Sequence, residues 1–145
     1  MKSILILGAT SDVAVAVARR FAENKYTLLL AARDIENASR IAKDISIRTH
    51  AEVKTLLFDA TDTASHPHFY KSLGVIPDVT VCVFGYLGDQ RKAETDWKEA
   101  ERTIQVNYTG AASILNIIAE DYEKTGKGTI VGISSVAGER GRQSN

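Results

Sequence analysis

Residues 3–14 read SILILGATSDVA, and this stretch decides the fold. The aliphatic run Ile4–Leu7 is typical of a strand buried on both faces, as parallel strands are. Gly8 then permits a tight turn. The Ala- and Val-rich stretch Val13–Asn24 follows, and it predicts a helix because apolar side chains recur every four residues at Val13, Val17 and Phe21.

The same alternation continues along the chain. Further strands are predicted at Tyr26–Ala31, Val53–Phe58, Val79–Phe84 and Thr129–Ser134, with helices at Ile35–Ile47, Thr63–Leu73 and Asp96–Lys124. The last helix has a predicted apolar stripe at Ile104, Tyr108, Ala111, Leu115, Ile118 and Tyr122.

Strands that alternate with helices indicate right-handed βαβ units and therefore an α/β fold. We predict three layers of Rossmann type, with helices on both faces of a parallel sheet in the order 3-2-1-4-5. Residues 1–145 would form one NAD(P)-binding domain. We expect this domain to be incomplete at its C-terminal end, because the later strands of such a sheet are absent from this sequence.

Composition and charge narrow the classes of function. Hydrophobic residues make up 44% of the 145 residues and charged residues 25%, as in ordinary globular proteins. The 18 basic residues balance the 18 acidic ones, which argues against binding to nucleic acid through bulk charge. The apolar runs are too short to span a bilayer. A single cysteine, Cys82, excludes a disulfide framework and, without a signal peptide, favours a cytoplasmic location.

Two other site classes are not supported. His66 and His68 flank Pro67, but two histidines without a third ligand do not form a metal site. Pro67 fits the start of a helix, or weakens the centre of the predicted one. The sequence also lacks the Gly-x-x-x-x-Gly-Lys-Ser/Thr motif of P-loop nucleoside triphosphatases.

The turn after the first strand lies where a phosphate-binding turn should lie. Backbone N–H groups at a helix start are unpaired, and the helix dipole favours an anion there. We therefore expect cofactor contacts from Gly8, Thr10, Ser11, Asp12 and Val13. The Asp12 carboxylate would repel a phosphate if it faced inward, so we expect it to cap the helix. One glycine is a weak fingerprint, and an ordinary βα connection with a Ser or Asp cap stays open.

Residues at the ends of the second and third predicted strands indicate which cofactor the chain would bind. Arg33 offers a guanidinium that can pair with a 2′-phosphate, which favours NADP(H). Asp34 follows it directly and keeps NAD(H) possible, because a carboxylate there accepts from the ribose 2′-hydroxyl. Asp59 ends the third strand beside Ala60, and we expect it to accept from the adenine amino group.

Five segments, taken in order, resemble the short-chain dehydrogenase/reductase family from Ile4 to Asn145. The first turn is similar to Gly-x-x-x-Gly-x-Gly, with Asp12 and Ala14 replacing the later glycines. Phe58–Asp62 is similar to the adenine-binding Asp segment. Only Gly85 of Cys82–Gly85 matches the family's Asn-Asn-Ala-Gly. Two further segments look like the family's Asn-bearing helix and its catalytic-serine strand, namely Val106–Gly110 and Gly132–Gly138.

The resemblance implies roles for individual residues. Ser135 would polarise the substrate carbonyl or hydroxyl, and Ser134 would point the other way because side chains alternate along a strand. Asn107, at the edge of the face packed on the sheet, would bend its helix and hold a water in a proton relay. Gly85 would lie against the cofactor. The implied activity is NADP(H)-dependent interconversion of a small-molecule alcohol and a carbonyl by hydride transfer, in a homo-oligomer paired through the helix Asp96–Lys124.

The family's acid/base pair is missing from this sequence. In the family a tyrosine acts as general acid/base, and a lysine four residues later lowers its pKa. No tyrosine here has lysine at that spacing, and the family's tyrosine would fall beyond Asn145. We therefore expect the 145-residue chain to be inactive alone. A non-catalytic nucleotide-binding module or sensor is the alternative. Arg33 argues against a third class, the methyl-donor-binding Rossmann proteins, since an acidic residue would suit the donor's ribose.

Overall fold

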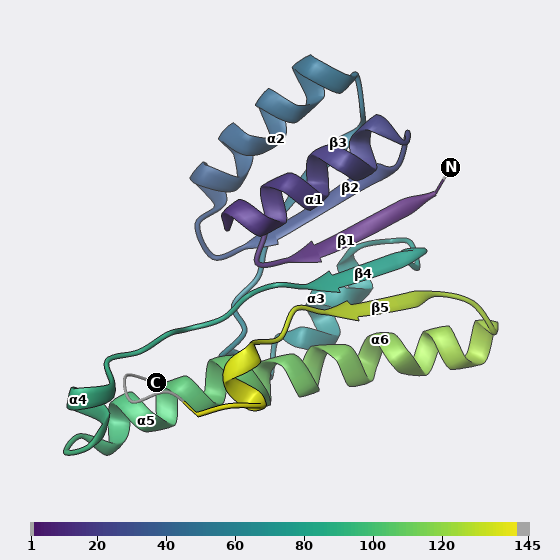
Figure 1. The fold of residues 1–145 in the computed structure, drawn as a ribbon. Helices are drawn as coiled ribbons and strands as arrows, with labels where there is room; N and C mark the ends of the chain where they lie inside the picture. Colours follow the sequence, from purple (N-terminus) through teal and green to yellow (C-terminus); the bar gives the residue numbers. More distant parts are fainter. Residues whose placement is uncertain (1, 142–145) are drawn as a thin grey trace.

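Five parallel strands form one sheet in the order β3-β2-β1-β4-β5 in the computed structural model, which describes residues 2–141 (Figure 1). Their bounds are β1 Ser3–Leu7, β2 Thr27–Ala32, β3 Val53–Leu57, β4 Val79–Cys82 and β5 Thr129–Gly132. In the centre of the sheet, Leu5 pairs with Leu29 on one side and with Thr80 on the other. The predicted strand order is confirmed.

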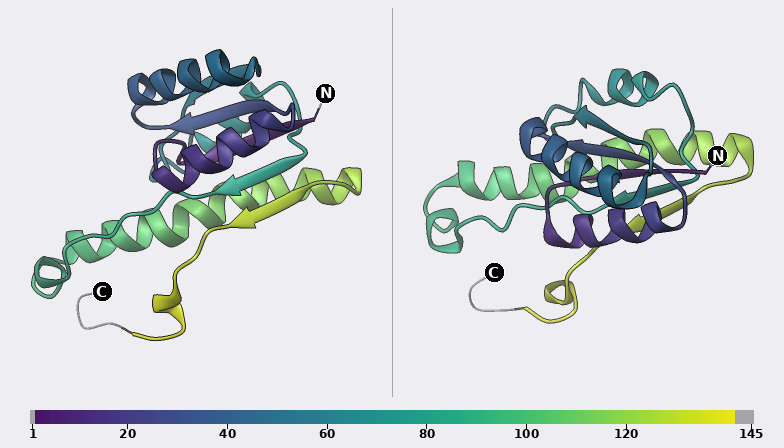
Figure 2. Two further views of the ribbon diagram at one scale, coloured as in Figure 1. Left: turned by 45° about the horizontal axis from the view of Figure 1, so that its top comes forward. Right: turned by 90° about the horizontal axis from the view of Figure 1, so that it is seen from above.

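Helices cover both faces of this sheet, so the predicted three layers are confirmed (Figures 1 and 2). Helices α1 (Asp12–Glu23) and α2 (Ile35–Thr49) lie on one face, and α3 (His66–Ser72) and α6 (Ala111–Thr125) on the other. The remaining helical segments are α4 Gln90–Ala93, α5 Trp97–Ile104, the π-helical segment Gln105–Gly110 and the 3₁₀ turn Val136–Gly138. None of the helices within residues 2–141 is long and apolar enough to cross a bilayer.

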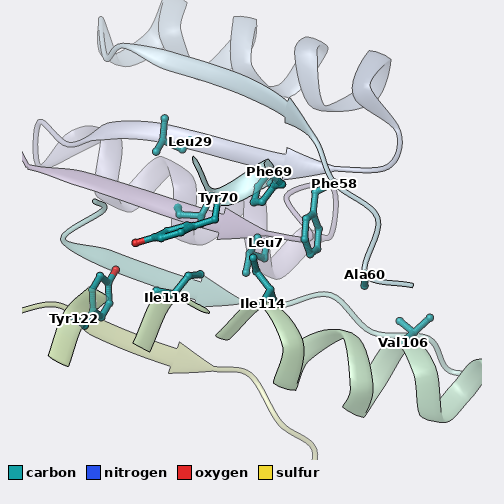
Figure 3. Close-up of a cluster of buried hydrophobic side chains, with 12 residues drawn as sticks. Leu7, Leu29, Phe58, Ala60, Phe69, Tyr70, Val106, Ile114, Ile118 and Tyr122 are labelled. Carbon is teal, nitrogen blue, oxygen red and sulfur yellow. The ribbon is translucent and has the colours of Figure 1, made fainter. Parts of the chain in front are cut away.

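Strand β1 divides the hydrophobic core into two clusters. Ile4 and Ile6 pack with α1 and α2, whereas Leu5 and Leu7 pack with α3 and α6. All four side chains are fully buried, and each contributes roughly 1.5–3 kcal/mol of hydrophobic free energy. Figure 3 shows the second cluster, in which α6 points its side chains toward the sheet. The alternation along β1 explains why its sequence is aliphatic at all four positions from Ile4 to Leu7.

The buried face of α1 differs from the predicted one by one residue. Ala14, Ala18 and Ala22 are buried, while Val13 is 51% exposed and Val17 and Phe21 only flank the core. Both rows have the four-residue spacing of a helix face, but the alanine row faces the strands because small side chains allow the closest approach to the sheet.

The predicted helix Asp96–Lys124 is α5, the π segment and α6 in direct succession, and its apolar stripe is only partly correct. Ile118 and Tyr122 are buried, but Ile104 is 49% and Tyr108 72% exposed. In the π segment the hydrogen bonds run from i to i+5 rather than i+4. The extra residue in this turn rotates the residues before it away from the face that α6 buries. That face continues instead through Val106 and Gly110.

Gly110 lets the π segment approach the turn after β3. A methyl group at this position would lie 2.2 Å from the carbonyl oxygen of Ala60, which is far inside van der Waals contact. The obstacle is backbone on both sides, so neither partner can simply rotate away. The long helix and the β3–α3 turn therefore fit together only with glycine at this position.

Replacing Gly110 with alanine should destabilise the protein by about 1–3 kcal/mol, the usual cost of overpacking. The matched control is Gly138→Ala, because an added methyl there meets no atom within 4 Å. Chemical denaturation of the two variants beside the wild type measures the difference. Equal stability of Gly110→Ala and Gly138→Ala would contradict the packing argument.

Candidate functional site

An open cleft of about 1560 Å³ runs along the carboxyl edge of the sheet, where ligands of open parallel sheets bind. It is bordered by the segments that follow each of the five strands and by α5 and the π segment. Most of the predicted site residues line it: Gly8, Thr10, Ser11, Arg33, Asp59, Ala60, Gly85, Asn107 and Ser135. Asp12 and Val13 lie next to it on the first turn of α1 but are not part of its lining.

The glycine turn is fixed by its two neighbouring strands. Gly8 and Ala9 both donate their amides to the carbonyl of Ala31, at 2.9 and 3.0 Å. Gly8 has a φ of 94°, and a Cβ atom there would lie 2.6 Å from the backbone nitrogen of Phe84. Glycine is therefore required both by the turn conformation and by the close approach of the chain leaving β4.

Ser11, and not Asp12, caps helix α1. The Ser11 backbone is extended, and its Oγ accepts from the amide of Ala14 at 3.2 Å. Asp12 is the first helical residue, and the helix dipole stabilises a carboxylate at this position. The expectation that Asp12 is the cap was wrong, because the serine before it already occupies the extended cap position. The amides of Asp12 and Val13 have no hydrogen-bond partner within residues 2–141.

The two residues after β2 have different environments. Asp34 caps α2, since its Oδ1 accepts from the amide of Asn37 at 2.9 Å. Arg33 is exposed, lines the cleft, and forms no ion pair with another residue of the described range. The guanidinium of Arg33 is therefore free to meet an anion, while the carboxylate of Asp34 is already used by the helix.

Asp59 is held in one orientation by its own turn. The amide and the hydroxyl of Thr61 both donate to its Oδ1, at 2.9 and 2.8 Å. Partial burial acts to raise the pKa of Asp59, but these two hydrogen bonds and the charge of Arg33 outweigh it and hold the pKa below its usual value. Asp59 is thus an ionised acceptor at neutral pH, beside Ala60 in the cleft.

Asn107 binds the chain that leaves β4. Its Nδ2 donates to the carbonyl of Tyr86, and its Oδ1 accepts from the amide of Tyr86, both at 2.7 Å. Asn107 is exposed rather than at the edge of the face packed on the sheet, because the π segment turns it toward this loop. Strand β4 ends at Cys82 instead of Phe84, and beyond it Asn107 satisfies both backbone groups of Tyr86.

A buried carboxylate that the sequence did not indicate anchors the same loop. Glu99 is 7% exposed and accepts from the Tyr86 hydroxyl at 2.7 Å and the Asp89 amide at 3.0 Å. Lys92 lies 3.7 Å from its second oxygen, and Arg102 stacks over the Tyr86 ring at 4.3 Å. The hydrogen bond from Tyr86, then that from Asp89, lower the pKa of Glu99. Tyr86 and Glu99 are 13 residues apart, and no periodicity of the sequence links them.

Ser135 lines the cleft from the segment that follows β5. Its Oγ accepts from the amide of Ala137 at 3.1 Å, which leaves the hydroxyl proton available to a ligand. Strand β5 ends at Gly132, and both Ser134 and Ser135 line the cleft. Both serines lie beyond the end of the strand, so strand alternation does not fix the direction of their side chains.

Two further side chains that line the cleft, those of Cys82 and Tyr86, do not have the lowered pKa that an acid/base group needs. Burial raises the pKa of the Cys82 thiol to about 11, so it is neutral and weakly nucleophilic at pH 7. The hydrogen bond to Glu99 raises the pKa of Tyr86, the opposite of what a phenolate needs. Tyr86 is also the one tyrosine among the described residues that line the cleft. Among the described residues, the site therefore offers a hydroxyl donor, an amide and phosphate-binding groups, but no tyrosine or cysteine with a lowered pKa.

Comparisons with known proteins show the family and the fold of this chain. The model of the short chain dehydrogenase family matches residues 2–145. An uncharacterized oxidoreductase of Streptomyces coelicolor is 36% identical, over 99% of this chain and 58% of that protein. A solved short-chain dehydrogenase of Sphingobium yanoikuyae in complex with NADPH superimposes with a TM-score of 0.87 at 25% identity, over 97% of this chain and 56% of that one. The fold is also that of an NAD⁺-bound xylitol dehydrogenase, with a TM-score of 0.88 at 23% identity over 97% and 55% of the two chains. This chain spans less than two thirds of the length of these proteins.

Glu99→Gln should lower thermal stability at pH 7, although glutamine can keep both hydrogen bonds to its Oε1. The pKa of Glu99 is held below its usual value of 4.5, so the ionised carboxylate stabilises the fold above that pH. This contribution is lost as the pH falls through the folded-state pKa. The difference in melting temperature between wild type and variant should therefore narrow below pH 4.5.

The control for this series is Glu101→Gln, an exposed carboxylate on the same helix. It should leave the melting temperature nearly unchanged at every pH. A gap between wild type and Glu99→Gln that stays constant down to pH 3 would mean that the Glu99 charge does not stabilise the loop.

Proposed function

Because this chain belongs to the short-chain dehydrogenase family, we propose that its cleft binds NADP(H) for the interconversion of a small-molecule alcohol and a carbonyl. The observation that carries the cofactor choice is the unpaired guanidinium of Arg33 at the cleft. Arginine pairs with a phosphate through two parallel hydrogen bonds. Asp34, which would favour NAD(H), already caps α2 with one of its oxygens.

The remaining residues fit the parts of such a nucleotide. The unpaired amides of Asp12 and Val13 suit the pyrophosphate, at a helix start whose dipole favours an anion. Gly8, Thr10 and Ser11 line the cleft beside them. This assignment gives Asp12 a role through its backbone amide and not through its carboxylate.

The adenine end would lie at the turn after β3. Asp59 is ionised, and both hydrogen bonds from Thr61 end on its Oδ1, which leaves Oδ2 to accept from an adenine amino group. Ala60 beside it is small and buried, so the base can approach the backbone. Gly85, held through the Asn107 clamp on its neighbour, would face the cofactor from the other side of the cleft.

The bound nicotinamide would supply or accept the hydride. Ser135 would donate its free hydroxyl proton to the substrate oxygen, where negative charge develops during reduction. Asn107 would keep the loop after β4 in place beside the substrate. A tyrosine and lysine outside these 145 residues would complete proton transfer, as the family resemblance implies.

The expected homo-oligomer remains part of this proposal. The side chains of Trp97, Ile104 and Tyr108 are apolar and exposed along α5 and the π segment. Ile104 and Tyr108 belong to the apolar stripe that the sequence predicted for this helix. A second copy that packs against this helix would remove them from water, which supports pairing through it.

Arg33→Ala should weaken NADPH binding by about tenfold to a hundredfold, the value of a hydrogen-bonded ion pair, and leave NADH binding nearly unchanged. Arg40→Ala, at an exposed arginine of α2, is the matched control. Fluorescence titration of the natural polypeptide with each nucleotide measures both constants. An equal loss for NADPH and NADH would refute the 2′-phosphate assignment.

Ser135→Ala in the natural polypeptide should lower turnover by about 10²–10³-fold, as loss of one oxyanion donor does, without changing the NADPH dissociation constant. The measurement is NADPH oxidation with a panel of aldehydes and ketones. If the wild type binds NADPH but turns over none of them, the sensor function would replace the enzymatic one.

A further inference from the structure

We propose that His66 is a positioning residue for the adenine end of the cleft, which it holds by joining the turn after β3 to helix α6. The proposal rests on the proposed nucleotide-binding function. Its structural basis is independent of that function, because it comes from a fully buried imidazole that contacts both elements.

Both ring nitrogens of His66 have a partner. Nε2 lies 3.0 Å from the carbonyl oxygen of Asp59, and Nδ1 lies 2.9 Å from the hydroxyl of Ser113 on α6. The ring also stacks on Phe58, with centroids 5.0 Å apart and an interplanar angle of 26°. A buried side chain of α3 that contacts both the turn after β3 and α6 fixes their relative positions.

The partners determine which nitrogen carries the proton. A carbonyl oxygen can only accept, so the hydrogen must be on Nε2. In the neutral ring, Nδ1 is then an acceptor and receives the Ser113 hydroxyl. His66 therefore has a defined tautomer, in which it donates to the β3–α3 turn and accepts from α6.

The hydrogen bond from His66 holds Asp59, the residue proposed to accept from the adenine amino group. Asp59 has its side chain oriented by Thr61 and its carbonyl held by His66. The next residue, Ala60, is pressed against Gly110 on the same long helix. If the hydrogen bond from His66 is lost, the Asp59 carbonyl keeps only the longer hydrogen bond from the amide of Asp62, at 3.3 Å, so the peptide and the carboxylate attached to it are held less firmly. The effect should therefore appear in ligand affinity as well as in stability.

The experiment compares three variants of the natural polypeptide. His66→Phe keeps an aromatic ring against Phe58 but removes both hydrogen bonds. His66→Gln restores them, because its amide nitrogen can reach the Asp59 carbonyl and its oxygen can accept from Ser113. His68→Phe is the matched control, since His68 is exposed two residues further along α3. The probes are NADPH and its adenine half, 2′,5′-ADP.

We expect His66→Phe to weaken both probes by about tenfold, the effect of one lost buried hydrogen bond. His66→Gln should recover most of the affinity, and His68→Phe should match the wild type. Folded His66→Phe protein with wild-type affinity for both probes would overturn the proposal. A wild type that binds neither probe would instead refute the proposed function.

A second measurement tests the contact even if His66→Phe does not fold. Long-range ¹H–¹⁵N NMR spectra of the wild-type protein report which imidazole nitrogen is protonated. The proposal requires the Nε2–H form. The Nδ1–H form would overturn it, because that tautomer cannot donate to the carbonyl of Asp59.

Discussion

The close approach of Gly110 to Ala60 is the constraint on which the cleft depends. At this point the long helix touches the backbone of the β3–α3 turn with no room for a Cβ atom. Three residues before it, Asn107 holds both backbone groups of Tyr86, and three residues after it, Ser113 meets His66. One stretch of helix thereby fixes the positions of two segments that line the cleft, the turn after β3 and the loop after β4.

The π segment makes this double role possible. In a regular α-helix, Asn107 and Gly110 would lie only about 60° apart around the axis, because each residue adds about 100° of rotation, and both would face the same side. The wider π turn brings Val106 and Gly110 into line with the buried face of α6 and leaves Asn107 pointing at Tyr86. Such segments occur often at functional sites. Here the cost of an irregular helix is offset by the two contacts that it orients.

Charge along the cleft is distributed in a way that suits a nucleotide. The unpaired amides at the start of α1 and the guanidinium of Arg33 attract phosphate. Three acidic groups in or near the cleft are already hydrogen-bonded: Asp34 by Asn37, Asp59 by Thr61, and Glu99 by Tyr86. Hydrogen bonding of these carboxylates to neighbouring groups reduces their repulsion of an anionic ligand.

Sequence periodicity predicted the sheet well because parallel strands that are buried on both faces have a strong apolar signal, as in Ile4–Leu7. It could not choose between the valine and alanine rows of α1, since both have helical spacing and only the sheet decides between them. The shift at Tyr108 was equally out of reach, because a π turn leaves no mark in the apolar pattern.

Some residues of the candidate site could likewise be predicted from the sequence, and others could not. Residues at strand ends, such as Arg33 and Asp59, could be placed from the sequence because the carboxyl ends of parallel strands meet at one edge. Glu99 could not, since its partners lie on a loop whose path depends on tertiary contacts. The spacing of His66 and His68 raised only the question of a metal, and the contacts of His66 with Asp59 and Ser113 needed the fold.

The most direct test of this account is a crystal structure of the natural polypeptide with NADPH. The account predicts the pyrophosphate at the amides of Asp12 and Val13, the adenine beside Asp59, and the 2′-phosphate within hydrogen-bond distance of Arg33. A nucleotide bound in the reverse orientation, or with its 2′-phosphate in solvent away from Arg33, would contradict it.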